Sequence, residues 1–392
     1  MDRDDARRGP DGWHTDFAAA LADPDDTLPF MPQPQAFHDQ TITQRVRLRD
    51  GGSRLRLMLS NEFGHEPLVI DAVTASGASG EPRQPVLLGG RARWMIPPGE
   101  FAVSDPVALP TTAGAELAVS CYVAGSAGPG AFLHSAQRTG RAAPGDQTAV
   151  ARASDVRASG DRSAGALAFT SLYWIARVLT DGAADGPVIV ALGDSITRGD
   201  GTSADGEQRY PDHLQARLLA KNGPGAVVLN AGIGGNRVLR PQVGPPMIER
   251  FDRDVLDIAG ATHVIVMGGI NDLGLPGLLG EPRPAAGEIV DGLLGMARRA
   301  AERGIQPVLG TMTPILGRHA FLSAAGNENI RQAVNHAILA QGDWPTADFA
   351  TAVADPTDAA RLAAAFDSGD GVHLNDAGAR ALAAAAVDLA VF

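Results

Sequence analysis

The second half of the chain carries four short, predominantly apolar runs, and these constrain the fold more than any other feature. They are rich in Val, Ile and Leu and lie at 187–193, 226–232, 263–269 and 306–314. Helical patterns separate them. Apolar strands that alternate with helices predict a parallel sheet covered by helices on both faces. We therefore expect a doubly wound α/β domain at residues 185–392.

The first half has a different pattern. Apolar and polar residues alternate in short runs between turn residues, as at 41–50 and 53–64. Alternation with a period of two is typical of half-buried antiparallel strands. Several such strands predict an all-β sandwich of jelly-roll type at residues 1–184, joined to the second domain by the linker "DGAADG". The interval 136–168, rich in Ala, Gly, Arg, Ser and Asp, is expected to be a long loop.

The composition of the chain excludes several classes of partner and of site. The 392 residues carry a net charge of −12, so the chain has no electrostatic reason to bind nucleic acid or anionic membranes. Cys121 is the single cysteine, which excludes an intrachain disulfide and a Cys-based zinc site. No run is long enough to span a bilayer, and no signal peptide precedes the first domain. We expect either a cytoplasmic protein or a secreted one whose leader has been removed, in an oligomeric state left open.

Residues suited to covalent catalysis follow the ends of the predicted parallel strands. In such sheets ligands bind at the carboxyl ends of the strands. The first strand is followed by Ser195, the second by "NAGIGGNR" (230–237) and the third by "GGIND" (268–272). Near the C-terminus, Asp370 precedes His373 by three residues. We expect all four segments to meet at one edge of the sheet.

These residues match the requirements of ester hydrolysis by a serine. That reaction needs a hydroxyl nucleophile, an imidazole base, a carboxylate that orients the base, and donors for the oxyanion. Ser195, His373 and Asp370 can fill the first three roles. Three groups can act as oxyanion donors: the backbone N–H of Ser195, the backbone N–H of Gly235 and the side-chain amide of Asn271.

Each feature also has a purely structural interpretation. Gly-Asp-Ser is ordinary turn chemistry, Asn271 with the following Asp can begin a helix, and Asp370 with His373 can form a surface ion pair. The loop around Gly235 can be a flexible loop or a degenerate nucleotide loop, but it lacks the third glycine of that motif. Their joint occurrence in chain order favours catalysis.

The sequence resembles the SGNH or GDSL-type hydrolases. The resemblance rests on "GDSIT" (193–197), "NAGIGGNR", "GGIND" and "DGVH" (370–373), and flanking segments resemble a bacterial branch with an added N-terminal β-sandwich. It implies a flavodoxin-like sheet, a catalytic Ser195, Asp370 and His373, and an oxyanion hole of Ser195, Gly235 and Asn271. The chain departs from the family at "RGD" after the first block and at Leu374, where the branch often has proline. Asp367 is a second acid near His373, but the family spacing favours Asp370.

The resemblance implies the activity. We expect hydrolysis of carboxylic esters through an acyl-enzyme, with no cofactor and no metal. The loop expected at 274–284 is only mildly apolar and no long lid is evident, which favours short, acetyl-like acyl groups, with carbohydrate esters as candidate substrates. Two alternatives stay open: acyl transfer to an acceptor other than water, and a carbohydrate-binding protein whose hydrolase-like domain no longer turns over.

Overall fold

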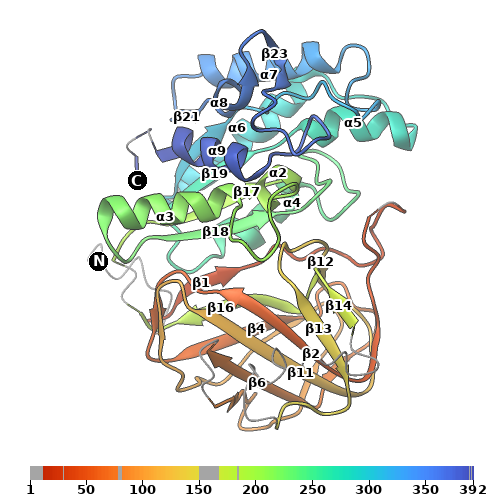
Figure 1. Ribbon diagram of the computed structural model, residues 1–392, viewed down its shortest axis with the longest axis vertical. Coiled ribbons are helices and arrows are strands. Elements are labelled where there is room, and N and C mark those ends of the chain that lie inside the picture. Colours follow the sequence, from red (N-terminus) through yellow and green to blue (C-terminus); the bar gives the residue numbers. More distant parts are fainter. Residues whose placement is uncertain are drawn as a thin grey trace. The chain divides into compact units, whose positions relative to one another are not determined.

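The structure is a computed structural model, and it divides into two compact units, Met1–Ala184 and Asp185–Phe392. It describes residues 12–29, 31–77, 82–149, 167–182, 185–387, 389 and 391–392. Each unit encloses its own core of buried apolar residues. Figure 1 shows strands throughout the first unit and a mixture of helices and strands in the second.

The described elements of the first unit are β-strands in two main antiparallel sheets. The larger sheet has six strands in the order β14-β13-β2-β11-β6-β7, and the smaller has four in the order β1-β16-β4-β9. Their bounds are β1 (His14–Ala18), β2 (Phe37–Arg47), β4 (Leu55–Ser60), β6 (Ala72–Gly77), β7 (Gln84–Pro85), β9 (Phe101–Val103), β11 (Glu116–Ala127), β13 (Gly140–Pro144), β14 (Leu167–Phe169) and β16 (Ile175–Thr180). The minor strands are β3 (Gly51–Gly52), β5 (Leu68–Ile70), β8 (Trp94–Ile96), β10 (Thr111–Thr112), β12 (Phe132–Leu133) and β15 (Leu172–Tyr173).

The alternating pattern of the sequence explains the core of this unit. Leu55, Leu57 and Leu59 of β4 all point inward and are fully buried, while Arg56 and Met58 between them are only half-buried. Such alternation confirms the prediction of half-buried antiparallel strands. Cys121 on β11 is also fully buried, and burial raises the pKa of its thiol to about 12, so it is unreactive. The jelly-roll topology stays a prediction.

The expectation of a loop over 136–168 is wrong for its described part. Gly140–Pro144 forms strand β13, which lies between β14 and β2 in the larger sheet. The segment carries no large apolar side chains, so it lacks the alternation that reveals a strand. Its two buried residues are Gly140 and Ala142, and small residues suffice at both positions. Residues 150–166 lie outside the described residues.

A five-stranded parallel sheet forms the centre of the second unit, as predicted. Its strands are β17 (Val188–Gly193), β18 (Val227–Gly232), β19 (His263–Met267), β20 (Gln306–Gly310) and β21 (Thr346–Ala347). Their order is β18-β17-β19-β20-β21, with every neighbouring pair parallel. This is the flavodoxin-like order, which reverses direction beside β17, and in such sheets ligands bind at the carboxyl ends of the strands beside the reversal. The strand β21 was not predicted, because it is only two residues long. A small hairpin of β22 (Ala354–Asp355) and β23 (Asp358–Leu362) follows.

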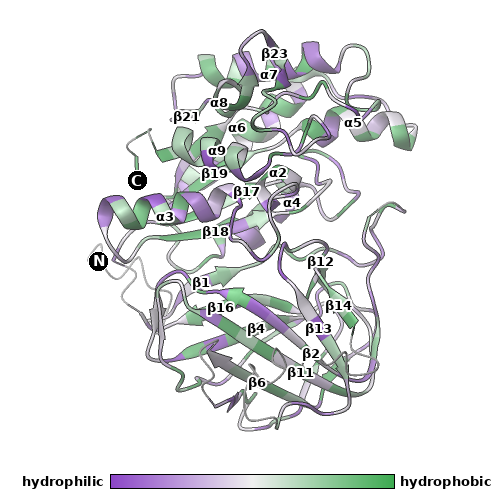
Figure 2. Ribbon diagram, viewed as in Figure 1, coloured by the Kyte–Doolittle hydropathy of each residue, from purple (hydrophilic) through white to green (hydrophobic). Residues whose placement is uncertain are grey.

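Helices cover both faces of this sheet (Figure 1). Their bounds are α2 (Ser195–Arg198), α3 (Tyr210–Asn222), α4 (Met247–Phe251) with the π-helix η1 (Asp252–Leu256), α5 (Ile270–Leu279), α6 (Ala286–Glu302), α7 (Asn327–Ala340), α8 (Phe349–Val353) and α9 (Asp376–Val387). In one layer α9 packs against α3 and α8, and in another α6 packs against α4 and α7. Figure 2 shows hydrophobic and hydrophilic residues alternating along α3, as one buried face requires. Among the described helices, none combines the length and the apolarity needed to cross a bilayer.

The loop expected at 274–284 is partly a helix. Residues 274–279 belong to α5, even though Gly274, Pro276 and Gly277 are poor helix formers. Burial outweighs their low propensity, because Leu273 and Leu275 are both 2% exposed. Tertiary packing therefore forms a helix whose first turn carries Asn271.

Candidate active site

Ser195 lies at a tight strand-to-helix turn. Strand β17 ends at Gly193, Asp194 caps helix α2, and Ser195 is the first residue of that helix. The Asp194 carboxylate accepts a hydrogen bond from the N–H of Ile196 at 3.0 Å. A side chain at Gly193 is sterically excluded, because its Cβ would lie 2.0 Å from Thr197 Oγ1. The turn therefore fixes the Ser195 hydroxyl at the carboxyl edge of the sheet.

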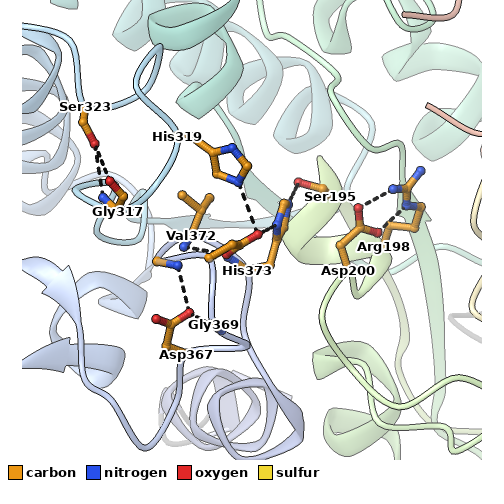
Figure 3. Close-up of polar contacts among 12 residues, drawn as sticks. Ser195, Arg198, Asp200, Gly317, His319, Ser323, Asp367, Gly369, Val372 and His373 are labelled. Carbon is orange, nitrogen blue, oxygen red and sulfur yellow. Dashed lines mark hydrogen bonds and ion pairs between the residues drawn. The ribbon is translucent and has the colours of Figure 1, made fainter. Parts of the chain in front are cut away.

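Ser195, His373 and Asp370 form a continuous chain of hydrogen bonds. His373 Nε2 lies 2.9 Å from Ser195 Oγ, and His373 Nδ1 lies 2.6 Å from Asp370 Oδ2 (Figure 3). The other carboxylate oxygen, Oδ1, accepts the backbone N–H groups of Val372 and His373 at 2.9 and 2.8 Å. Because the carboxylate can only accept, Nδ1 carries the proton, and Nε2 presents a lone pair to the serine hydroxyl.

The two charges in this chain stabilise each other. Burial alone would raise the pKa of Asp370. The pKa nevertheless lies well below its usual range, because His373 contributes a hydrogen bond and a nearby charge, and two backbone N–H groups also donate to the carboxylate. Burial alone would lower the pKa of His373, yet its hydrogen bond to Asp370 and the negative charge of Asp200 raise it above the ordinary value. The site thus stabilises an imidazolium, which is the form that appears when a base takes a proton.

Asp367 has a different role from Asp370. Its Oδ1 accepts the backbone N–H groups of Gly369 and Gly371 at 2.7 and 2.9 Å. These bonds close the turn that carries Asp370. Asp367 therefore shapes the loop, and the carboxylate that contacts His373 is that of Asp370.

The loop after β18 lies against the serine turn. The N–H of Ile233 bonds to the Gly193 carbonyl at 3.1 Å, which ties the loop to the end of β17. Gly235 adopts φ +79°, a conformation that favours glycine. Asn271 Nδ2 donates to the carbonyl oxygen of Asn236 at 3.0 Å. Asn271 thus bonds to the residue after Gly235, and one N–H of its amide is left for another acceptor.

Asp272 anchors the same loop from α5. Its carboxylate accepts the N–H groups of Val238 and Leu239 at 2.7 and 3.0 Å. Burial raises the pKa of Asp272 to about 6, although both backbone hydrogen bonds act in the opposite direction. Burial likewise raises the pKa of Asp194 to about 6. Two buried carboxylates therefore hold the segments on either side of the site.

Part of this chain is similar to known proteins. The family model for the GDSL-like lipase/acylhydrolase family matches residues 191–381. These residues belong to that family. Among curated proteins, the uncharacterized lipoprotein YqeF of Bacillus subtilis is 30% identical over 134 residues, or 33% of this chain and 51% of that protein. The chain thus spans about half the length of the curated relative that it matches.

Solved structures also resemble the GDSL domain. One is a G-D-S-L family lipolytic protein, described as putative, from Desulfitobacterium hafniense, with 20% identity, a TM-score of 0.40 and coverage of 52% of this chain and 99% of that chain. Another is an aryl esterase of M. smegmatis in an inhibitor-bound form, with 17% identity, a TM-score of 0.41 and coverage of 52% of this chain and 97% of that chain.

Arg250 is a buried residue of the GDSL domain that sequence reasoning did not single out. Its guanidinium donates to the carbonyl oxygens of Gly193 and Ala231, both at 2.9 Å. It also donates to Asn236 Oδ1 at 2.9 Å and to Asp254 Oδ2 at 2.7 Å. One side chain therefore connects the ends of β17 and β18 with the loop that carries Gly235. No sequence signal distinguishes this arginine from the many others.

Three more polar residues of the GDSL domain lie beside the hydrogen-bonded chain of Ser195, His373 and Asp370. Arg198, whose side chain is 4% exposed, donates through Nε to Asp200 Oδ1 at 2.8 Å, and a Cβ at Gly234 would lie 2.2 Å from its guanidinium. His319 Nε2 lies 3.3 Å from Asp370 Oδ2. Figure 3 shows Arg198 and Asp200 on one side of Ser195 and His319 on the other. His319 lies nine residues beyond the end of β20, so no strand-end pattern in the sequence marks it.

Proposed function

We propose that the GDSL domain hydrolyses carboxylic esters through an acyl-enzyme formed on Ser195. One observation carries the proposal: the hydrogen-bonded chain from Ser195 through His373 to Asp370. The chain connects the three groups in the order that the first step needs. The hydroxyl faces a basic nitrogen, and the other ring nitrogen is held by an ionised carboxylate.

In the first half-reaction Ser195 Oγ attacks the carbonyl carbon of the ester. Its proton moves to His373 Nε2, and the carbonyl π electrons move to the oxygen. The backbone N–H groups of Ser195 and Gly235 and the Asn271 amide are the proposed donors to that oxyanion. The tetrahedral species then expels the alcohol, which takes the proton from His373, and the acyl group stays on Ser195.

Water completes the cycle by the same route in reverse. His373 accepts a proton from water as the oxygen attacks the acyl carbon, and the same donors stabilise the second oxyanion. Collapse releases the carboxylic acid and returns the proton to Ser195 Oγ. Throughout, Asp370 keeps the imidazole oriented and offsets its positive charge.

We propose short acyl groups on polar alcohols, such as carbohydrate esters, as substrates. Charged and polar side chains flank Ser195: Arg198 with Asp200 on one side and His319 on the other. A long alkyl chain placed against Asp200 and His319, whose side chains are partly exposed, would desolvate them without offering hydrogen bonds, which is costly. An acetyl group and a hydroxyl-rich alcohol avoid that cost.

Covalent labelling tests the nucleophile. A fluorophosphonate should modify the full-length protein once, on the peptide that carries Ser195, and the S195A variant should not react. The matched control is S203A, which removes an exposed hydroxyl bonded to Asp376 and should be labelled like the parent. Labelling of another serine in the parent would reject the assignment. A series of p-nitrophenyl esters from acetate to palmitate tests chain length, and faster turnover of the long esters would reject the substrate class.

A further inference from the structure

We propose that His319, Asp370 and His373 form a binding site for a divalent transition metal ion such as Zn²⁺, and that the bound ion switches the esterase off. The switching step rests on the proposed function, whereas the metal site itself does not. Among the described residues, these three offer ligand atoms that all lie within 4.8 Å of one another. In this proposal the ion inhibits the esterase and takes no part in the hydrolysis.

The donor atoms converge on one oxygen. His319 Nε2 lies 3.3 Å from Asp370 Oδ2, and His373 Nδ1 lies 2.6 Å from the same oxygen. Zinc bonds of about 2.0–2.2 Å in a tetrahedron place ligand atoms about 3.3–3.5 Å apart. The His319 contact already has this spacing, and the His373 contact needs to open by less than about 1 Å.

The loop that carries His319 is fixed against the turn that carries Asp370. The N–H of Arg318 donates to the carbonyl oxygen of Asp370 at 3.0 Å. Gly317 packs so closely that a Cβ there would lie 2.7 Å from the Gly371 Cα. Ser323 Oγ bonds to the Gly317 carbonyl at 3.1 Å and closes the loop from the other side (Figure 3). The second imidazole is therefore held in place before any ion arrives.

The chemical types of the three ligand atoms determine which metal ions the site would prefer. Two imidazole nitrogens and one carboxylate suit Zn²⁺, Co²⁺, Ni²⁺ or Cu²⁺, whereas Mg²⁺ and Ca²⁺ prefer oxygen ligands. The side chains of His319, Asp370 and His373 are 36%, 31% and 22% exposed, so an ion can reach them from solvent. A water molecule can fill the fourth position of a tetrahedron.

Metal binding would stop catalysis by changing the tautomer of His373. In the working state Nδ1 carries the proton and Nε2 accepts from Ser195. An ion on Nδ1 requires a lone pair there, so the proton of the neutral ring moves to Nε2. The ring then has no lone pair for the Ser195 proton, and the Asp370 carboxylate is occupied by the ion. The general base is lost without any covalent change.

Two measurements on the full-length chain test the site. Calorimetric titration with Zn²⁺, and the visible absorption of bound Co²⁺, report binding directly and are repeated in the S195A variant, where no turnover occurs. We expect one ion per chain. We also expect Zn²⁺ to inhibit ester hydrolysis, EDTA to restore it, and Mg²⁺ to have no effect.

Variants assign the ligands. H319A removes one ligand and should weaken Zn²⁺ binding and inhibition at least about tenfold, judged against the variant's own metal-free rate. The matched control is H336A, which removes an exposed histidine on α7 and should behave like the parent. Unchanged zinc affinity in H319A, or equal losses in both variants, would overturn the site. Metal binding without any effect on turnover would overturn the switch, and activation by Zn²⁺ would do the same. A protein that binds Zn²⁺ through His319 but hydrolyses no ester would reject only the proposed function.

Discussion

The guanidinium of Arg250 donates a 2.9 Å hydrogen bond to the carbonyl oxygen of Gly193, the last residue of β17. Ser195 follows two positions later. The same guanidinium also bonds to the carbonyl oxygen of Ala231 at the end of β18 and to Asn236 beside Gly235. One buried cation thus holds the turn that carries Ser195 and the loop that carries Gly235.

Removing that cation should destabilise the domain strongly. R250M leaves the buried Asp254 carboxylate and two carbonyl groups without this partner, and loss of one member of a buried ion pair costs about 3–5 kcal/mol. R253M is the matched control, because Arg253 also contacts Asp254 but is 24% exposed, and it should cost about 1 kcal/mol or less. Chemical denaturation measures both free energies of unfolding. Equal losses in the two variants would refute the special position of Arg250.

Asn271 should act in the transition state. N271A removes the proposed oxyanion donor and should lower kcat by about 10²–10³ with little change in KM. N271D keeps the shape but replaces the amide with a carboxylate that cannot donate, so it should be at least as slow. Steady-state kinetics with a p-nitrophenyl ester separates the two constants. A large rise in KM at unchanged kcat would place Asn271 in substrate binding instead.

The fall of kcat/KM at low pH, which is the acid limb of the pH profile, should depend on the charge of Asp200. His373 must be neutral to accept a proton, so kcat/KM falls as the pH drops through its pKa in the free enzyme. Burial lowers that pKa, but the bond to Asp370 and the charge of Asp200 outweigh it and raise the pKa. D200N removes one negative charge near the ring, so the limb should move to lower pH. E302Q, an exposed change at the end of α6, should leave the limb in place. A shift to higher pH in D200N would contradict this account.

Asp272 should make stability depend on pH. Burial raises the pKa of its carboxyl to about 6 in the folded state, above an unfolded value of about 3.9, so the folded chain binds this proton more tightly. Its contribution to the free energy of unfolding is therefore largest below pH 4 and declines as the pH rises toward 6. Relative to D272N, the parent should lose on the order of 2–3 kcal/mol across that window. A difference that is flat or rises with pH would show that Asp272 is ionised throughout.

The sequence predicted the parallel sheet well because its strands are buried on both faces. Runs such as 188–193 and 264–267 are apolar without interruption, which distinguishes them from amphipathic helices of similar length. The two-residue strand β21 carries no such signal, and α5 was hidden by Gly274 and Pro276. In both cases tertiary contacts decide the local structure.

The sequence likewise predicted some residues of the candidate site and missed others. Ser195, Asp370 and His373 stand at strand ends or in the C-terminal loop, so topology alone brought them to one edge, where their hydrogen bonds now join them. Arg250 and His319 could not be found from spacing. Their importance comes from partners that are distant in the sequence, and nothing in their own neighbourhoods marks them.

Trapping the acyl-enzyme tests the central claim most directly. The full-length protein is mixed with p-nitrophenyl acetate, quenched in acid during turnover, digested and examined by mass spectrometry. We predict one added acetyl group on the Ser195 hydroxyl in the parent and none in S195A. Steady hydrolysis of the ester with no acetyl group on Ser195, or with the acetyl group on another residue, would contradict the account.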